Sequence, residues 1–313
     1  EMLRSLVGSE MCIRDRFRNI FHNVLIFIVL LLSLTNPDIM AKGALDGLDL
    51  WYKALIPALF PFMILSNVII NLNLTEGVNM FMRPLTFILK LKKEAGYGIF
   101  AGLFFGYPAC AAACCNLVKK NTISKEDANI CIASFNNVSP AFLSGFVCME
   151  ILENANCFLP VFLIFYSCTL ITSFIIRYII FQKYRDTYTS VSVPMPQKSA
   201  LIDKSILSAL KNIGKLGGYI IVFSILSHCI MSFIPFHPEI LCMLIEITTG
   251  LTVSDRRYLT FLPFISLGGV CGMFQTFSVD ENNIIDKKIY ILGKFISAVI
   301  TMAVCGIVIL FQS

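Results

Sequence analysis

Two apolar stretches of this chain are interrupted by residues that break helices and form hydrogen bonds. The first interruption is Gly106-Tyr107-Pro108, and the second is Asn136-Asn137-Val138-Ser139-Pro140. Each asparagine side chain offers one acceptor oxygen and two N–H donors, which suits a ribose hydroxyl, a base edge or a dehydrated cation. Ser139 is also a favourable N-cap, and Pro140 suits the first helical turn. The second break therefore predicts helix capping, and ligand contact by the same asparagines is compatible with it.

A third interruption and one acidic residue lie in the second half of the chain. Glu246 is the only carboxylate well inside an apolar run, and Gln275 and Thr276 follow a glycine-rich break at 268–272. An acid at membrane depth is costly and marks a candidate functional site. Glu246 could couple transport to protons or sodium or contact a solute, or it could pair structurally with Thr248 or a neighbouring helix. The sequence leaves both roles open, and Gln275 and Thr276 could face the same cavity.

Two sets of residues follow from these patterns. The candidate solute-binding residues are Gly106, Tyr107, Pro108, Asn136, Asn137, Ser139, Glu246, Gln275 and Thr276. The expected helix breaks or hinges are Pro57, Pro61, Pro140, Gly217, Gly218, Gly268 and Gly269. No metal site or cofactor is expected, because the twelve cysteines include no CxxC pair and suit close packing between helices. Arg177 and Lys294 stand near the ends of apolar runs, where long side chains reach the membrane interface, so neither is assigned a role.

The elements that must position these residues are membrane helices. The chain is 57% hydrophobic and 14% charged, with a mean hydropathy of +0.77, whereas soluble domains carry roughly 25% charged residues. The sequence predicts an all-α integral membrane protein with about 7–9 transmembrane helices of ~20 residues each. The predicted spans are 20–34, 51–72, 128–151, 157–181, 217–235, 239–252 and 289–311. Segments 96–118 and 258–278 are apolar but interrupted, so each could cross once or re-enter.

A polar linker at 182–204 separates a first membrane half at 17–181 from a second at 205–313. Residues 1–16 resemble a translated sequencing adapter, and we expect them to be non-native. In each half, helix breakers near the start of an apolar helix are followed by an interrupted segment, around Gly106 and around Gly268. Paired interruptions of this kind are typical of transporters that bind solute between two repeats. A two-fold internal repeat is therefore an open possibility.

The net charge of +5 reflects membrane topology, and we expect no nucleic-acid partner. Lysine and arginine favour the cytoplasmic side of a membrane. This rule places the connectors at 90–93, 119–127, 182–204, 255–257 and 287–288 in the cytoplasm and those at 36–50 and around Glu153 and Glu239 outside. All basic connectors share one side only if 96–118 and 258–278 both re-enter without crossing.

Four blocks occur in order along the chain: Ile56-Pro57-Ala58-Leu59-Phe60-Pro61-Phe62, then Gly106-Tyr107-Pro108, then 123–128, then Asn136 to Pro140. Together they resemble the YlbJ family of sporulation integral membrane proteins, which belongs to the nucleoside-recognition or Gate-domain membrane proteins. The resemblance runs from about Trp51 to Thr276. It departs at Ala109-Cys110, where the family commonly has a small glycine. It implies a multi-pass protein of the bacterial cytoplasmic membrane, with the lipid bilayer as partner and a nucleoside as a candidate substrate.

Two functional hypotheses follow. The favoured one is a passive or ion-coupled transporter or channel of the Gate-domain type for a nucleoside or another small polar solute, working by movement of the interrupted helices. The alternative is a non-transporting membrane scaffold for assembly of the spore envelope, cortex or coat, in which the breaks only pack. We do not expect an enzyme, because the sequence carries no nucleotide-binding loop, nucleophile elbow or zinc-protease motif. The sequence leaves homo-oligomerisation open.

Overall fold

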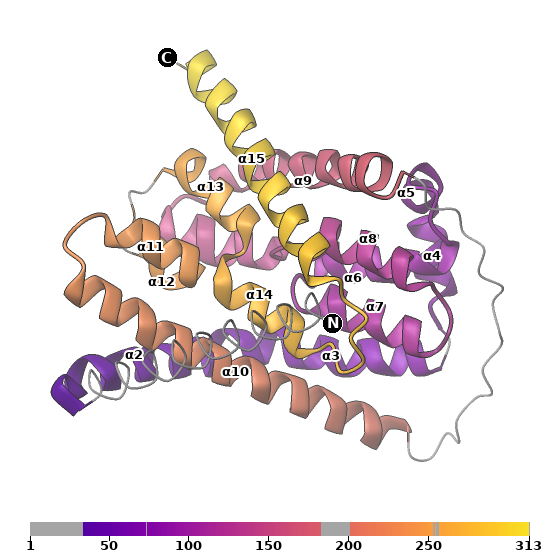
Figure 1. Cartoon of the computed structure of the whole chain (residues 1–313), viewed down its shortest axis with the longest axis horizontal. Helices are drawn as coiled ribbons and strands as arrows, with labels where there is room; N and C mark the ends of the chain where they lie inside the picture. The colour runs from indigo at the N-terminus through magenta and orange to yellow at the C-terminus, as the bar shows by residue number, and fades with distance from the viewer. Residues whose placement is uncertain (1–33, 73, 183–200, 253, 255–256, 313) are drawn as a thin grey trace, which may run out of the picture.

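The computed structural model of the chain describes residues 34–72, 74–182, 201–252, 254 and 257–312. The expected leader at 1–16, nearly all of the predicted span 20–34 and most of the linker 182–204 lie outside these residues. The described part is built from helices and contains no strand (Figure 1). Within the described part, four helical segments are long and apolar enough to cross a membrane, namely Ala155–Ile180, Ile202–Phe233, Tyr258–Ser278 and Lys287–Phe311. The predicted all-α membrane class is confirmed.

The first described element is a nearly unbroken rod made of α2 (Pro37–Asp49), the π-helix η1 (Leu50–Leu55) and α3 (Ile56–Asn71). The residues at both joints keep right-handed helical backbone angles. Pro57 and Pro61 were expected to break or hinge this segment, but the helix continues through both. Proline removes one backbone donor and crowds the preceding turn, and a π-helical stretch just before Pro57 is a common way to absorb such a disturbance.

The long helix α10 (Leu201–Phe233) runs antiparallel to this rod along one side of the molecule (Figure 1). A Cβ atom added to Gly43 would lie 2.8 Å from the Cα of Ile225, and one on Gly47 would lie 2.8 Å from the Cα of Ile221. Small residues permit this close backbone approach, which drives helix association in lipid. At the other end of the pair, Asn71 Nδ2 donates to Ser205 Oγ at 3.4 Å.

The expected hinge at Gly217 and Gly218 is wrong, because α10 is continuous through both residues. A Cβ on Gly217 would lie 2.5 Å from the ring of Trp51, and Trp51 Nε1 donates to the carbonyl of Ile213 at 2.9 Å. Gly217 therefore makes room for an aromatic ring. The helix stays intact there because a straight helix already satisfies its backbone groups in lipid.

Two segments fold back as helical hairpins. In the first, α6 (Gly96–Phe104) and α7 (Ala109–Lys119) are antiparallel, and a Cβ on Gly98 would lie 2.4 Å from Cys114 Sγ. In the second, α11 (Pro238–Ile245) and α12 (Ile247–Thr252) meet where a Cβ on Gly250 would lie 2.3 Å from the backbone nitrogen of Met243. Each helix rises about 9–17 Å at 1.5 Å per residue, at most about half of a ~30 Å hydrocarbon core. Segment 96–118 thus folds back on itself, and the expectation that 239–252 forms one spanning helix is wrong.

Two other segments are broken helices. Helix α8 (Lys125–Phe135) and the π-helix η3 (Phe142–Ile151) are separated by the break at Asn136–Pro140, and α13 (Tyr258–Leu267) and α14 (Gly269–Ser278) are separated at Gly268. The expected breaks at Gly268 and Gly269 are present, because both residues have positive φ, of 84° and 62°. The two halves of the second broken helix form one apolar span, Tyr258–Ser278. This segment is long and apolar enough to cross, whereas placing all basic connectors on one side required it to re-enter.

The order of elements is repeated in the described part of the chain. A long helix, a hairpin, a broken helix and a straight helix occur first as α3, α6/α7, α8/η3 and α9 (Phe158–Ile175, continued by η5 at Ile176–Ile180), and again as α10, α11/α12, α13/α14 and α15 (Lys287–Gln312). The first copy also contains α4 (Glu76–Phe81), α5 (Arg83–Ile88) and the short 3₁₀ turns η2 (Lys93–Ala95) and η4 (Ala155–Cys157). The Gly106 hairpin thus corresponds to the Glu246 hairpin, and not to the break at Gly268 as the sequence comparison suggested.

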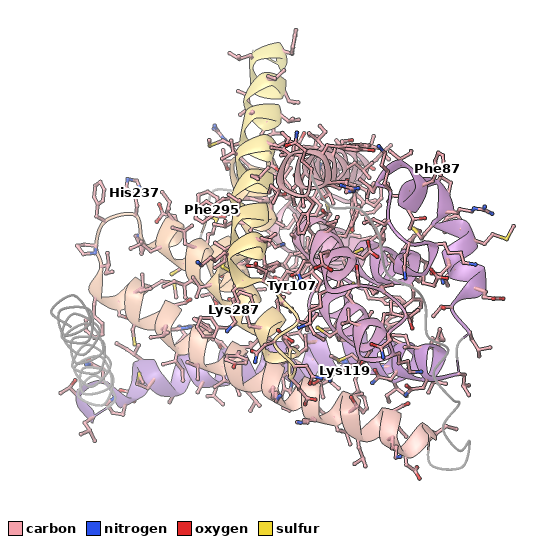
Figure 2. The ribbon with its side chains drawn as sticks, turned by 45° about the vertical axis from the view of Figure 1, so that its right-hand side comes forward. Phe87, Tyr107, Lys119, His237, Lys287 and Phe295 are labelled. Atoms are coloured by element: carbon pink, nitrogen blue, oxygen red, sulfur yellow. The ribbon has the colours of Figure 1, made fainter. Side chains whose placement is uncertain are left out.

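Ion pairs mark one end of the bundle. Glu281 accepts from Lys211 at 2.5 Å and from Lys119 at 3.2 Å, and these bonds lower the pKa of Glu281 to about 2. Lys215 Nζ donates to the carbonyl of Ser278, the last residue of α14, at 3.2 Å. Arg257 precedes α13, at the other end of the segment Tyr258–Ser278. A crossing of this segment would put Arg257 on the side opposite Lys119, in conflict with the cytoplasmic position expected for 255–257. Figure 2 shows His237 at the upper left of the molecule and Lys119 below its centre.

Cysteine labelling tests this topology. In a cysteine-free background, Arg257→Cys should react with an impermeant maleimide in intact cells, whereas Lys119→Cys and Lys198→Cys should react only after permeabilisation. The reason is that Tyr258–Ser278 is long and apolar enough to cross once and that lysine-rich connectors stay inside. Labelling of residue 198 from outside would reverse the orientation. Labelling of residues 257 and 119 from the same side would contradict the crossing.

Candidate functional site

The tip of the first hairpin lies against the break in the first broken helix. The backbone N–H of Tyr107 donates to the carbonyl of Asn137 at 2.7 Å. Gly106 has φ of 79°, and a Cβ there would lie 2.8 Å from the nitrogen of Ser139. Ser139 caps the helix that follows, since its Oγ accepts from the backbone N–H of Phe142 at 3.2 Å. The two interruptions predicted from the sequence therefore form one structural unit.

Asn136 ties this unit to the second half of the chain. Its side chain is fully buried, and its Nδ2 donates to Thr276 Oγ1 at 2.8 Å and to the hydroxyl of Tyr290 at 3.3 Å. Its Oδ1 accepts from the backbone N–H of Ala111 at 3.4 Å. One amide thus connects the first hairpin with α14 and α15, so Asn136 and Thr276 belong to the same site.

Asn137 holds a buried ammonium group. Lys294 Nζ, on α15, donates to Asn137 Oδ1 and to the backbone carbonyl of Asn136, both at 2.6 Å. The amide nitrogen of Asn137 donates in turn to Thr169 Oγ1 at 3.2 Å and to the carbonyl of Ser134 at 3.1 Å. Lys294 is only 1% exposed. The break in the helix therefore supplies a free carbonyl and an amide oxygen to a cation.

Two aromatic rings complete the surroundings of this cation. Lys294 Nζ lies 5.9 Å from the centroid of the Tyr107 ring and 5.6 Å from that of Tyr290, within the range of cation–π attraction. Figure 2 shows Tyr107 in the interior, close to α15. Among the described residues, no carboxylate forms a salt bridge with Lys294. The positive charge is thus held by neutral oxygens and ring faces.

The sequence interpretation missed this lysine. We expected Lys294 and Arg177 to reach the membrane interface, but both are buried. Arg177 Nε donates to the carbonyl of Leu89 at 2.6 Å, which joins the end of α5 to η5. Lys294 lies seven residues into α15, about 10 Å from its start at 1.5 Å per residue, and points toward the carbonyls that the break leaves free. The criterion that singled out Glu246, a charge inside an apolar run, would also have found Lys294.

Glu246 forms the tip of the second hairpin. It has an extended backbone between α11 and α12, and its carboxylate accepts from the backbone N–H groups of Thr248 at 3.1 Å and Thr249 at 2.8 Å, with the Thr249 hydroxyl also at 2.8 Å. The structural pairing with Thr248 that the sequence left open is present. A Cβ on Gly269 would lie 3.2 Å from the carbonyl of Ile245, so this tip contacts the second break as the first tip contacts the first.

The predicted residues Gln275 and Thr276 lie on α14. Thr276 Oγ1 donates to the carbonyl of Gly272 at 2.8 Å and lies 3.1 Å from the hydroxyl of Tyr290. A Cβ on Gly272 would lie 3.2 Å from the ring of Tyr107, which brings the two halves together. Gln275 is buried but donates to Cys271 Sγ at 3.1 Å. The site therefore joins Tyr107, Asn136, Asn137 and Thr276 to Lys294, while Glu246 and Gln275 make separate contacts.

Comparison with known proteins agrees with the sequence interpretation. The sporulation integral membrane protein YlbJ of Bacillus subtilis (strain 168) is 24% identical to the chain over 268 residues, which covers 77% of the chain and 62% of that protein. The chain is similar to YlbJ over most of its length. The resemblance to the YlbJ family is thereby confirmed, although this chain matches less than two thirds of the length of YlbJ. No family model and no solved structure matches the chain.

The close contact at the first hairpin tip predicts a stability effect. Gly106→Ala should lower the melting temperature of the detergent-solubilised protein, because a left-handed backbone costs a non-glycine residue about 1–2 kcal/mol and the new methyl would lie 2.8 Å from the nitrogen of Ser139. Gly145→Ala is the matched control, since nothing lies within 4 Å of a Cβ there. Equal melting temperatures for the two variants would contradict this account of the tip.

Glu246→Gln separates the structural and coupling roles of Glu246. Glutamine keeps only one acceptor oxygen, so the backbone N–H of either Thr248 or Thr249 would lose its acceptor. We therefore expect a loss of about 1–3 kcal/mol of stability, measured by thermal unfolding, and no change in the pH or sodium dependence of flux. Glu246→Asp, which keeps an acceptor-only carboxylate, should lose less. Unchanged stability with an altered ion dependence would assign Glu246 to coupling instead.

Proposed function

We propose that this chain forms the core of a membrane transporter of the Gate-domain type that moves a small anionic solute. By analogy with its relative, we place it in sporulation. The observation that carries the proposal is the buried Lys294 ammonium. It is held at the break after α8 by two oxygens, of Asn136 and Asn137, that bear no formal charge. These ligands satisfy its hydrogen bonds but leave one positive charge uncompensated at the site.

The charge of the buried Lys294 ammonium supports an anionic solute. An ionised side chain at membrane depth is costly and is retained where it pairs or acts. Since no described carboxylate pairs with Lys294, an incoming carboxylate or phosphate would compensate its charge. The helix that starts after Ser139 presents backbone N–H donors at the same break, and such termini favour anions. Both features favour an anion over a neutral solute such as a nucleoside.

The paired interruptions between the two halves of the chain support a transporter. Irregular backbone at membrane depth is tolerated only where protein buries it or where it lines a cavity, and transporters commonly bind solute at paired interruptions between repeats. Here both hairpin tips contact breaks, and the halves meet where Tyr107 packs on Gly272. Lys294 is closed off in this arrangement. Access would require the first hairpin tip to separate from α14 and α15, with Gly106 and Gly268 as pivots.

A second candidate function rests on a different observation. Both donors of Asn136 and both of Asn137 are already bonded within the protein. A site that is satisfied without a ligand also fits a membrane scaffold for spore-envelope assembly, in which the breaks only stabilise packing. The two functions differ in whether purified protein moves a solute.

Flux through proteoliposomes tests the anion. Wild-type protein should transport a small aromatic dicarboxylate such as pyridine-2,6-dicarboxylate faster than a nucleoside. Lys294→Met should reduce that flux roughly 10- to 100-fold, the equivalent of a lost charge-assisted contact of ~1.5–3 kcal/mol. Asn137→Asp should act in the same direction, because the new carboxylate would neutralise the ammonium 2.6 Å away.

Lys288→Met is the matched control, since Lys288 is exposed on the same helix, and it should leave the flux unchanged. Faster transport of the nucleoside that persists in Lys294→Met would contradict the anion and favour a neutral solute. No flux of either solute by protein that is correctly inserted, together with normal sporulation of cells carrying Lys294→Met, would favour the scaffold.

A further inference from the structure

A hollow of about 470 Å³ lies between α10 and α14, away from the Lys294 site. It is lined by Lys215, Gly218, Tyr219, Val222, Phe223 and Phe274. Figure 1 shows these two helices side by side. Val222 is 54% exposed and Phe274 is 46% exposed, so the hollow opens onto the outer surface of the helix bundle. Its volume lies in the range of small-molecule sites, about 300–1,000 Å³.

Glycine and aromatic residues give this hollow its shape. Nothing lies within 4 Å of a Cβ built on Gly218, so the absent side chain leaves open space on the α10 surface. The rings of Tyr219 and Phe223 lie 5.8 Å and 5.5 Å from the ring of Phe274, measured between centroids. The two glycines that were expected to hinge α10 thus have separate roles, with Gly217 against Trp51 and Gly218 open to the hollow. The lining suits a hydrocarbon chain.

A cation stands at one end of this apolar lining. Lys215 Nζ donates to the carbonyl of Ser278 at 3.2 Å, and an ammonium group carries three N–H donors. Lys211, one turn earlier, pairs with Glu281, but among the described residues Lys215 has no salt-bridge partner. An anionic group could therefore bind Lys215 while an attached chain enters the hollow.

The position of Lys215 along α10 matches a membrane boundary. From Lys215 to the end of the helix at Phe233, α10 rises about 27 Å at 1.5 Å per residue, close to the ~30 Å of a hydrocarbon core. Lys119, Lys211 and Glu281 gather at the same end. The hollow thus runs from the headgroup level of one leaflet into its acyl region.

We propose that this hollow is a binding site for an anionic phospholipid of the leaflet at the Lys119 end, with its phosphate on Lys215 and one acyl chain beside Gly218. Basic pockets between membrane helices on the cytoplasmic side bind anionic headgroups in this way. A phospholipid fits both parts of the site, because it joins a negative charge to a hydrocarbon chain. The site is independent of the transport proposal, since Lys294 hydrogen-bonds to Asn136 and Asn137, neither of which lines the hollow.

Native mass spectrometry of the full chain tests the site with two added lipids, phosphatidylglycerol and phosphatidylcholine. Wild-type protein should retain phosphatidylglycerol preferentially. Lys215→Gln should weaken its retention about fivefold, as expected for one lysine near a membrane surface, and Gly218→Leu should weaken it at least as much by filling the hollow. Both positions are at the surface or partly exposed, and thermal unfolding would verify that both variants fold.

Two controls make the experiment specific. Lys211→Gln removes an equal charge one turn away, and Gly214→Leu adds an equal side chain at another glycine of α10 with nothing within 4 Å. Both should retain phosphatidylglycerol as the wild type does. Equal loss in controls and test variants, equal retention of the two lipids, or a dimer that Gly218→Leu disrupts would each overturn the proposal, the last by assigning the hollow to a second copy of the chain.

Discussion

At membrane depth, a broken helix persists only if other protein groups replace the hydrogen bonds that it gives up. The architecture of this protein depends on that constraint. The carbonyl of Asn137 accepts from Tyr107 N–H, and the carbonyl of Asn136 accepts from Lys294. At the second hairpin, the carboxylate of Glu246 accepts from the first N–H groups of α12. Lys294 and Glu246, the charged side chains of these two regions, thus both satisfy backbone groups that the irregular segments leave free.

The two halves meet the same constraint with different chemistry. The first break uses amides and a lysine, whereas the second uses glycines at positive φ and a hairpin tip packed against them. The two halves therefore repeat the order of their elements, but different residues satisfy the backbone groups at their breaks. This asymmetry places one ammonium group at the first break and gives the site its positive character.

The structure revises one of the spans expected from the sequence. The sequence interpretation counted 239–252 as a span and left open whether 258–278 crosses or re-enters, yet 239–252 folds back as a hairpin while Tyr258–Ser278 is long and apolar enough to cross. As one helix, residues 239–252 would rise only about 21 Å, and Glu246 provides the acceptors for a reversal within them. Length and the position of the acid distinguish these two segments.

The sequence by itself determined the features that depend on local chemistry. Composition and run length gave the all-α membrane class, glycine and proline marked the breaks at Gly106, Ser139 and Gly268, and Ser139 was recognisable as a cap because its partner Phe142 is three residues away. Tertiary structure alone decided which groups meet. Lys294 and Asn136 are 158 positions apart, so no local rule could pair them. Gly217 and Trp51 are likewise joined only by helix packing, since residues distant in the sequence come into contact through the fold of the whole chain.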